Sequence, residues 1–257
     1  EANALAYMGQ IEINMGNKSS GFEKYREALT IHRRAGNKRG ECITLGNLGG
    51  QLARYGESKN AIENLERAIQ IAKEIGHTRG IVAFHTNIGL AYKLDGEYEK
   101  AEKHIRESLD MTKGAGDKRS LAVGHLNLSC VLSKMGRIQE AVDEARRSLR
   151  FACAVNALTT QARALGNLGS LMRKTDRFEM SINCFKEAFK RSSLAEDHSA
   201  LAGHAIGESR SLLEMGRTEK ALEKYSEAVS LKERYSLDSE GEDDLKELEE
   251  MLEICDE

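Results

Sequence analysis

A repeat with a period of 40 residues runs through most of the sequence. The motif LGNLG occurs at residues 45–49 and again at 165–169, three periods later. The asparagine at its centre also recurs in the two intervening repeats, giving Asn47, Asn87, Asn127 and Asn167. A fixed period of roughly 20 to 50 residues is typical of stacked repeat architectures, so this feature constrains the fold more than any other.

Two columns of small residues follow the same period. One column is glycine at five of its six positions, namely Gly16, Gly56, Gly96, Gly136 and Gly216, with Asp176 as the exception. The other contains Gly21, Ala61, Ala101, Ala141, Ser181 and Ala221. Glycine readily adopts the left-handed conformation that ends a helix, so the first column predicts a turn between two helices. The second column predicts the place where those helices cross closely.

Composition supports a fold made only of helices. The chain has no proline, and no segment alternates apolar and polar residues as a half-buried strand would. In the second repeat we expect helix A over about residues 37–55 and helix B over about 58–75, where apolar residues recur every three or four positions. The predicted fold is therefore all-α, a right-handed superhelical solenoid of six antiparallel helix pairs.

The predicted organisation has two parts. Residues 1–237 hold six units, at 1–40, 41–80, 81–120, 121–160, 161–200 and 201–237. Residues 238–257 contain 11 Asp and Glu against one Lys, a net charge of −10, whereas residues 1–237 carry 37 Lys and Arg against 30 Asp and Glu, a net charge of +7. We expect this acidic segment to include an amphipathic helix that caps the last open helix pair, through Leu245, Leu248, Met251 or Leu252, and Cys255. Alternatively, the acidic tail folds back onto the basic groove and competes there with acidic partners.

The pattern resembles the tetratricopeptide repeat family. Its motif of small, bulky and aromatic positions is met best by Gly89, Tyr92, Gly96, Tyr98, Ala101 and Ser108. The 40-residue spacing with LGNLG in helix A also resembles the Leu-Gly-Asn repeat polarity adaptors. The resemblance implies a non-enzymatic adaptor that binds a segment of a partner protein in a concave groove lined by the A helices. It further implies that the recurring asparagine holds the peptide backbone of that segment.

Cations accompany the asparagines on the same face of helix A. An Asn side chain both donates and accepts hydrogen bonds, and flanking Arg and Lys favour acidic side chains in the guest. Arg39, Arg79 and Arg119 also lie in the first turn of a helix, where the dipole disfavours a cation. The predicted binding residues are Arg39, Asn47, Arg54, Arg79, Asn87, Arg119, Asn127, Lys134, Arg163, Asn167 and Lys174. The alternative interpretation is that the amides only satisfy neighbouring carbonyl groups and that the cations are ordinary solvated surface.

Other function classes are less favoured by the residues. Binding of single-stranded RNA would need stacking aromatic residues, and Tyr7 and Phe84 are the main candidates. A regulatory or oligomerising platform within a larger signalling protein, including self-association, stays open. No catalytic or phosphate-binding motif occurs, so no enzyme activity and no cofactor are predicted.

Metal, disulfide and membrane roles are also disfavoured. His85 and His125 occupy one column of the repeat, which favours packing or hydrogen bonding over metal ligation. The five cysteines form no CxxC pair, so reduced thiols in a cytoplasmic protein are expected. No apolar run approaches the ~18 residues that a membrane-spanning helix needs, so no membrane insertion is expected.

Overall fold

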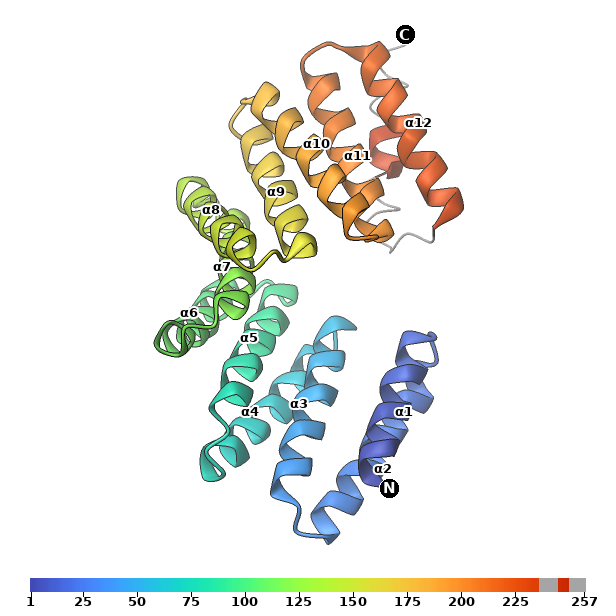
Figure 1. The fold of residues 1–257 in the computed structure, drawn as a ribbon. Coiled ribbons are helices and arrows are strands. Elements are labelled where there is room, and N and C mark those ends of the chain that lie inside the picture. The colour runs from blue at the N-terminus through green and yellow to red at the C-terminus, as the bar shows by residue number, and fades with distance from the viewer. Residues whose placement is uncertain (236–244, 250–257) are drawn as a thin grey trace. The chain divides into compact units, whose positions relative to one another are not determined.

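The computed structural model describes residues 1–235 and 245–249. Over these residues the chain is helical, with no strand, and consecutive helices form antiparallel pairs (Figure 1). The chain divides into two compact units, Glu1–Gly116 and Asp117–Glu257. The expected all-helical, tetratricopeptide-like solenoid architecture is confirmed.

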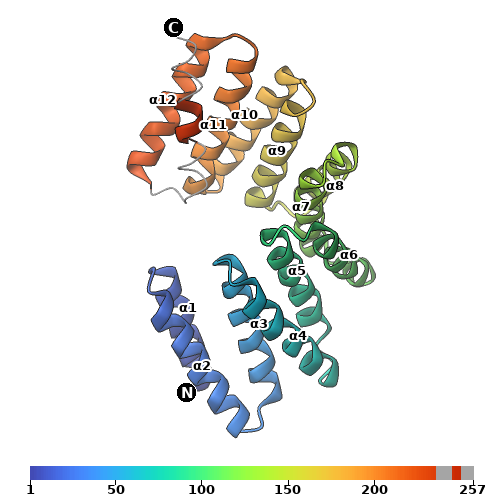
Figure 2. The ribbon, with the colours of Figure 1, turned by 180° about the vertical axis from the view of Figure 1, so that it is seen from behind.

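The first unit contains three helix pairs. Each pair packs on the next along the chain, and the A helices of neighbouring pairs also touch, as α1 does α3 and α3 does α5. The view from behind in Figure 2 shows the same succession of pairs. The helices are α1 (Ala2–Asn14), α2 (Lys18–Arg34), α3 (Lys38–Arg54), α4 (Ser58–Glu74), α5 (Thr78–Leu94) and α6 (Tyr98–Ala115).

The second unit repeats this arrangement. Its A helices again contact one another, α7 with α9 and α9 with α11. The helices are α7 (Lys118–Lys134), α8 (Ile138–Ala154), α9 (Leu158–Arg173), α10 (Phe178–Leu194), α11 (His198–Glu214) and α12 (Thr218–Arg234).

Helix ends follow the period because particular backbone conformations recur. Gly56 has φ +76° and Gly76 has φ +68°, the left-handed geometry that ends a helix. The side chain of Asn37 accepts a hydrogen bond from the Gly40 amide and thereby caps α3. By its residue type Asn156 is expected to cap the next helix as Asn37 does, but it takes the left-handed conformation itself, with φ 49°. It occupies the same repeat position as Gly76, one residue before the N-cap of α9, so the prediction that Asn156 is a cap is wrong.

A third column of small residues lies on helix A, at positions 49, 89, 129 and 169, and meets the column of Ala61 where the helices of a pair cross. A Cβ added to Gly49 would lie 2.6 Å from Leu65 Cγ and 3.1 Å from the main-chain oxygen of Ala61. Where serine replaces glycine in the A-helix column, Ser129 Oγ donates to the Ala141 main-chain oxygen at 2.6 Å. The close approach predicted from the columns is therefore present in both units.

Each unit has its own aliphatic core. In the first unit, Leu65 and Ile88 are fully buried in one cluster that extends from Ile13 to Ala91. In the second unit, Leu245 and Leu248, which are 5% and 0% exposed, pack in a cluster with residues of α10, α11 and α12. Residues 245–249 are helical and belong to the segment that is expected to form the cap. Met251, Leu252 and Cys255, together with the rest of the acidic tail, lie outside the described residues.

Candidate functional site

The four recurring asparagines lie at matching positions of four A helices. Asn47 is exposed, and Asn87, Asn127 and Asn167 are half-buried. Asn47 and Asn87 belong to the first unit and the other two to the second. None of the four amides bonds to a main-chain carbonyl of the described residues, so the alternative in which they only satisfy such carbonyls has no support in the structure.

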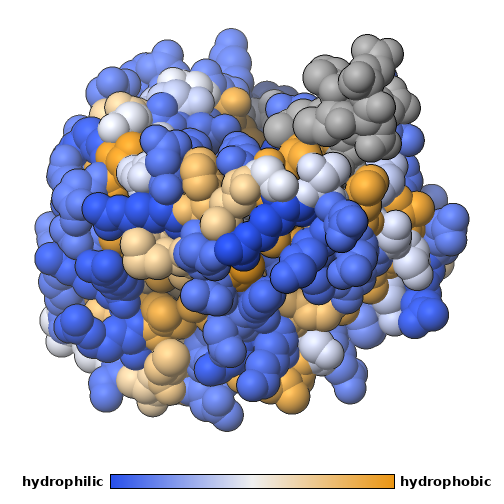
Figure 3. All heavy atoms as spheres, turned by 90° about the horizontal axis from the view of Figure 1, so that it is seen from above, coloured by the Kyte–Doolittle hydropathy of each residue, from blue (hydrophilic) through white to orange (hydrophobic). Residues whose placement is uncertain are grey.

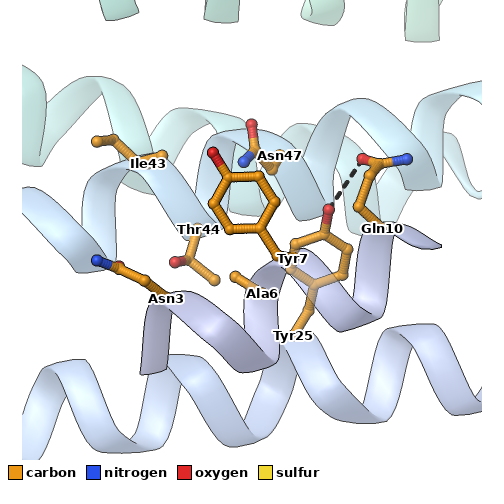
Figure 4. A pocket seen from close by; sticks show the side chains of 8 residues that line it. All are labelled: Asn3, Ala6, Tyr7, Gln10, Tyr25, Ile43, Thr44 and Asn47. Carbon is orange, nitrogen blue, oxygen red and sulfur yellow. Dashed lines mark hydrogen bonds between the residues drawn. The ribbon is translucent and has the colours of Figure 1, made fainter. Parts of the chain in front are cut away.

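In the first unit, Asn47 borders a pocket of about 200 Å³ between α1, α2 and α3. Figure 4 shows the side chains around it, with the Tyr25 hydroxyl donating to Gln10 Oε1 at 3.0 Å. Gln51 Nε2 also donates to that oxygen, at 2.8 Å. The lining residues are Asn3, Ala6, Tyr7, Gln10, Tyr25, Ile43, Thr44 and Asn47. These bonds fix the floor of the pocket, while Asn47 makes no side-chain hydrogen bond within the described residues.

The predicted binding residues do not include several of these lining residues, among them the exposed Tyr7. Its side chain is 75% exposed, and Ile43 on the neighbouring helix is 42% exposed. Tyr7 stands 40 residues before Asn47, so it occupies the asparagine position of the first repeat. Alignment by the period alone would have placed it there. An exposed aromatic and an exposed aliphatic side chain beside a free amide can hold both the apolar and the polar parts of a peptide.

Asn87, one repeat later, lies against the main chain of α3. A Cβ placed on Gly50 would come 2.9 Å from Asn87 Nδ2, so the glycine leaves room for this amide. The side chain of Asn87 makes no hydrogen bond with the described residues. Its donor and acceptor are both available to a ligand.

In the second unit the two amides differ. Asn167 Nδ2 donates to Ser129 Oγ at 2.7 Å, which joins α9 to α7. Lys174 Nζ donates to Ser133 Oγ at 3.2 Å along the same pair of helices. The Asn127 side chain makes no hydrogen bond within residues 1–235 and 245–249. The structure therefore gives Asn167 and Lys174 a contact between repeats that Asn127 lacks in this part of the chain.

The predicted cations are all exposed. With the exception of Lys174, none makes an ion pair or side-chain hydrogen bond with the described residues. These free cations are Arg39, Arg54 and Arg79 in the first unit and Arg119, Lys134 and Arg163 in the second. Figure 3 shows one face of the molecule, on which hydrophilic residues predominate and short hydrophobic patches lie between them.

The sixth repeat departs from this pattern. Gly207 stands in the asparagine column, and a Cβ there would lie 2.4 Å from Phe185 Cε1, so a larger residue would displace that ring. Glu208 replaces the aliphatic residue of its column and is 2% exposed. Burial raises the pKa of its carboxyl group, against the opposing effect of Lys224 and Lys186. The amide series therefore ends with the fifth repeat.

No helix among the described residues combines the length and apolar character that crossing a lipid bilayer requires.

Several solved structures share this fold. BtubC (BKLC) from P. vanneervenii aligns with a TM-score of 0.73 at 14% identity, over 83% of this chain and 90% of that one. A Rap protein complexed with competence and sporulation factor aligns with a TM-score of 0.72 at 12% identity, over 96% and 72%. A signal transduction ATPase with a tetratricopeptide repeat sensor from Pyrococcus horikoshii gives 0.73 at 13%, over 96% of this chain but only 41% of that one.

Two protein-family models match parts of the chain. The model for anaphase-promoting complex subunit 5 matches residues 42–91. The tetratricopeptide repeat model matches residues 81–154 and 160–234, together more than half of the chain. No curated protein matches the chain. Neither family model describes a catalytic family, and the fold is of the kind used as a protein-interaction scaffold. The chain belongs to the tetratricopeptide repeat family.

Proposed function

We propose that this chain is a non-enzymatic adaptor whose A helices hold an extended acidic segment of a partner protein. The observation that carries the proposal is the set of amides at one repeat position that have no hydrogen-bond partner among the described residues. Asn47, Asn87 and Asn127 share this property, although each is exposed or half-buried on its helix. Polar side chains in such places are normally bonded to protein or solvent, so a ligand backbone is a fitting partner.

The chemistry of the amide suits a peptide backbone. One Asn side chain offers a donor and an acceptor, which match the carbonyl and N–H groups of an extended segment. Main-chain recognition of this kind does not read sequence, so specificity has to come from neighbouring groups. In the first unit, Tyr7 and Ile43 supply exposed apolar surface beside Asn47.

The preference for acidic segments rests on the free cations. Arg39, Arg54 and Arg79 in the first unit have no acidic partner among the described residues. An Arg guanidinium can bind a carboxylate with two parallel hydrogen bonds, which makes it a good reader of Asp and Glu. An acidic guest would therefore gain charge-assisted contacts that a neutral guest lacks.

Structural neighbours are compatible with this proposal. One is a Rap protein solved as a complex with competence and sporulation factor. Another is the apo form of the quorum sensor NprR from B. thuringiensis. At 12% and 14% identity these likenesses concern the fold, so the ligand class proposed here rests on the residues of this chain. We also propose, from the LGNLG motif and the 40-residue spacing, that the chain is similar to the Leu-Gly-Asn repeat adaptors.

Selection from a library of short random peptides on the full chain tests the ligand class. We expect enrichment of Asp and Glu in the selected peptides. The best peptide is then titrated by fluorescence anisotropy against the wild type and the Asn47→Ala/Asn87→Ala variant. Loss of two backbone contacts should weaken binding by about 1 to 3 kcal/mol, or about 5- to 150-fold.

The matched control is Asn60→Ala/Asn64→Ala, which removes one exposed and one half-buried asparagine from the B helix α4. It should leave the affinity unchanged. Equal binding by wild type and Asn47→Ala/Asn87→Ala, with unchanged helicity, would refute the amide site. Selected peptides without acidic residues would refute the ligand class while leaving the site itself intact.

A further inference from the structure

A cluster outside the peptide site contains two histidines and a glutamate. His85 comes from α5, and His104 and Glu107 come from α6, all within the first unit. His104 and Glu107 are three residues apart, so they share one face of their helix. One potential ligand atom from each residue lies within 4.8 Å of the other two. This cluster is called the His85 cluster below.

The distances within the His85 cluster are short and similar. His85 Nδ1 lies 3.1 Å from His104 Nδ1 and 3.1 Å from Glu107 Oε2. His104 Nδ1 lies 3.7 Å from the same carboxylate oxygen. The two ring centroids are 5.3 Å apart, well beyond the separation of the Nδ1 atoms. Each ring therefore turns its Nδ1 toward the other ring and toward the carboxylate.

These three atoms match one face of a tetrahedral metal site. Zinc binds His nitrogen and carboxylate oxygen at about 2.0 to 2.2 Å, so ligand atoms in a tetrahedron are about 3.3 to 3.5 Å apart. The distances in the cluster bracket this value. We propose that the His85 cluster binds a divalent transition metal of the zinc type, through His85 Nδ1, His104 Nδ1 and Glu107 Oε2.

The next repeat provides an internal comparison, because the same three positions hold His125, Glu144 and Arg147. There His125 Nδ1 lies 2.5 Å from Glu144 Oε2, and Arg147 Nη1 lies 2.9 Å from Glu144 Oε1. The arginine supplies a permanent cation that pairs with the carboxylate.

No arginine occupies the corresponding place in the His85 cluster, where the third position is Glu107. The carboxylate faces two imidazoles instead of a guanidinium. Burial lowers the pKa of both His85 and His104, and the charge of Glu107 opposes this effect. The pKa of His85 is lowered further by His104 and Lys73. The pKa of His104 is lowered further by Lys103. Neutral imidazole is the form that ligates metals. A bound dication would supply the positive charge that Arg147 supplies in the next repeat.

The surroundings of the cluster hold its ligands in place and leave it open to solvent. The side chains of His85 and His104 are 15% and 20% exposed, and that of Glu107 is 42% exposed. Tyr92 stacks on the His104 ring at a centroid distance of 5.6 Å. An open side leaves a fourth coordination position for water or for a donor atom of a partner.

Zinc is the first metal to test because two nitrogens and one carboxylate oxygen are a known zinc ligand set. Titration of the full chain with Zn²⁺ in a calorimeter should show one equivalent binding and a raised melting temperature. Co²⁺ serves as a coloured substitute for zinc. Its spectrum should lack a thiolate charge-transfer band, which would report binding at cysteine instead.

The decisive variant is His104→Glu/Glu107→Arg, which copies the arrangement of the next repeat and therefore preserves a hydrogen-bonded network. It should melt close to the metal-free wild type and bind Zn²⁺ at least tenfold more weakly. The reciprocal variant, Glu144→His/Arg147→Glu, should gain a second equivalent. Unchanged affinity in His104→Glu/Glu107→Arg, a thiolate band with Co²⁺, or no binding by the wild type would each overturn the proposal.

Discussion

Replacement of Gly49 by alanine tests how closely the helices of one pair approach. Gly49 is the second glycine of the first LGNLG motif and lies where α3 crosses α4. An added Cβ would lie 2.6 Å from Leu65 Cγ and 3.1 Å from the main-chain oxygen of Ala61. Leu65 is fully buried, and its Cγ can move only by a change of χ1, which would push the rest of the side chain into its packed neighbours. The helices themselves must separate.

Two effects of opposite sign decide the outcome. Overpacking a close-packed site costs about 1 to 3 kcal/mol. Alanine in place of glycine within a helix gains about 0.5 to 1 kcal/mol. We therefore expect Gly49→Ala to lower the free energy of unfolding, by up to about 2.5 kcal/mol. Gly203→Ala, at a helical position in α11 where a Cβ meets nothing within 4 Å, should instead stabilise by about 0.5 to 1 kcal/mol.

Thermal unfolding followed by circular dichroism measures both variants. Repeat proteins can unfold in stages, so amide hydrogen exchange in α3 and α4 is the companion measurement for Gly49→Ala. Exchange should accelerate there and remain unchanged in α11. Equal stabilisation by both substitutions would refute the reasoning, because it would mean that the crossing has room for a methyl group.

Three further predictions concern single contacts in the second unit. Burial lowers the pKa of His204 to about 4, against the opposing effect of Asp197. Between about pH 6.5 and 4, this histidine therefore takes up a proton in the unfolded chain and stays neutral in the folded chain. Stability should therefore fall as pH falls through this window, by at most about 3 kcal/mol, and His204→Leu should remove that part of the loss in urea titrations at pH 7 and 4.5. Ser129→Ala removes the hydroxyl that accepts from Asn167, and a double-mutant cycle with Asn167→Ala should give a coupling of about 0.5 to 1.5 kcal/mol; additive effects would contradict the bond. Glu208→Leu restores the aliphatic residue of its column and, by removing a buried carboxylate, should raise the melting temperature at pH 7, whereas a lowered value would show that its lysine pairs outweigh the burial.

Much of the fold could be predicted from the sequence because each helix pair repeats the same local signals. Helix A of the second repeat was expected over about residues 37–55, and α3 spans Lys38–Arg54 with Asn37 and Tyr55 as its caps. Each helix end recurs at the same position of every repeat, so one atypical residue does not obscure where the helices end. Asn156 shows the limit, since residue type alone does not distinguish a capping amide from one in the left-handed position.

The candidate sites depend more on contacts between helices. Sequence reasoning placed the asparagines on helix A, but their hydrogen-bond state is set by the neighbouring repeat. The Asn167 side chain finds Ser129 as a partner, whereas those of Asn47 and Asn87 find none in the part of the chain that the structure describes. Metal ligation at His85 was disfavoured because His125 shares its column, and the difference between the two clusters lies in the partners at 104 and 107 on helix B.

The sequence by itself determined the helical class, the 40-residue period and the places where helices end, because these depend on local conformational preferences repeated along the chain. The tertiary structure decided which repeated positions are chemically distinct. That depends on packing between helices, which brings together side chains 19 or 38 residues apart, as in His85 with His104 and Ser129 with Asn167. Identical residues in one column thereby acquire different partners, burial and charge.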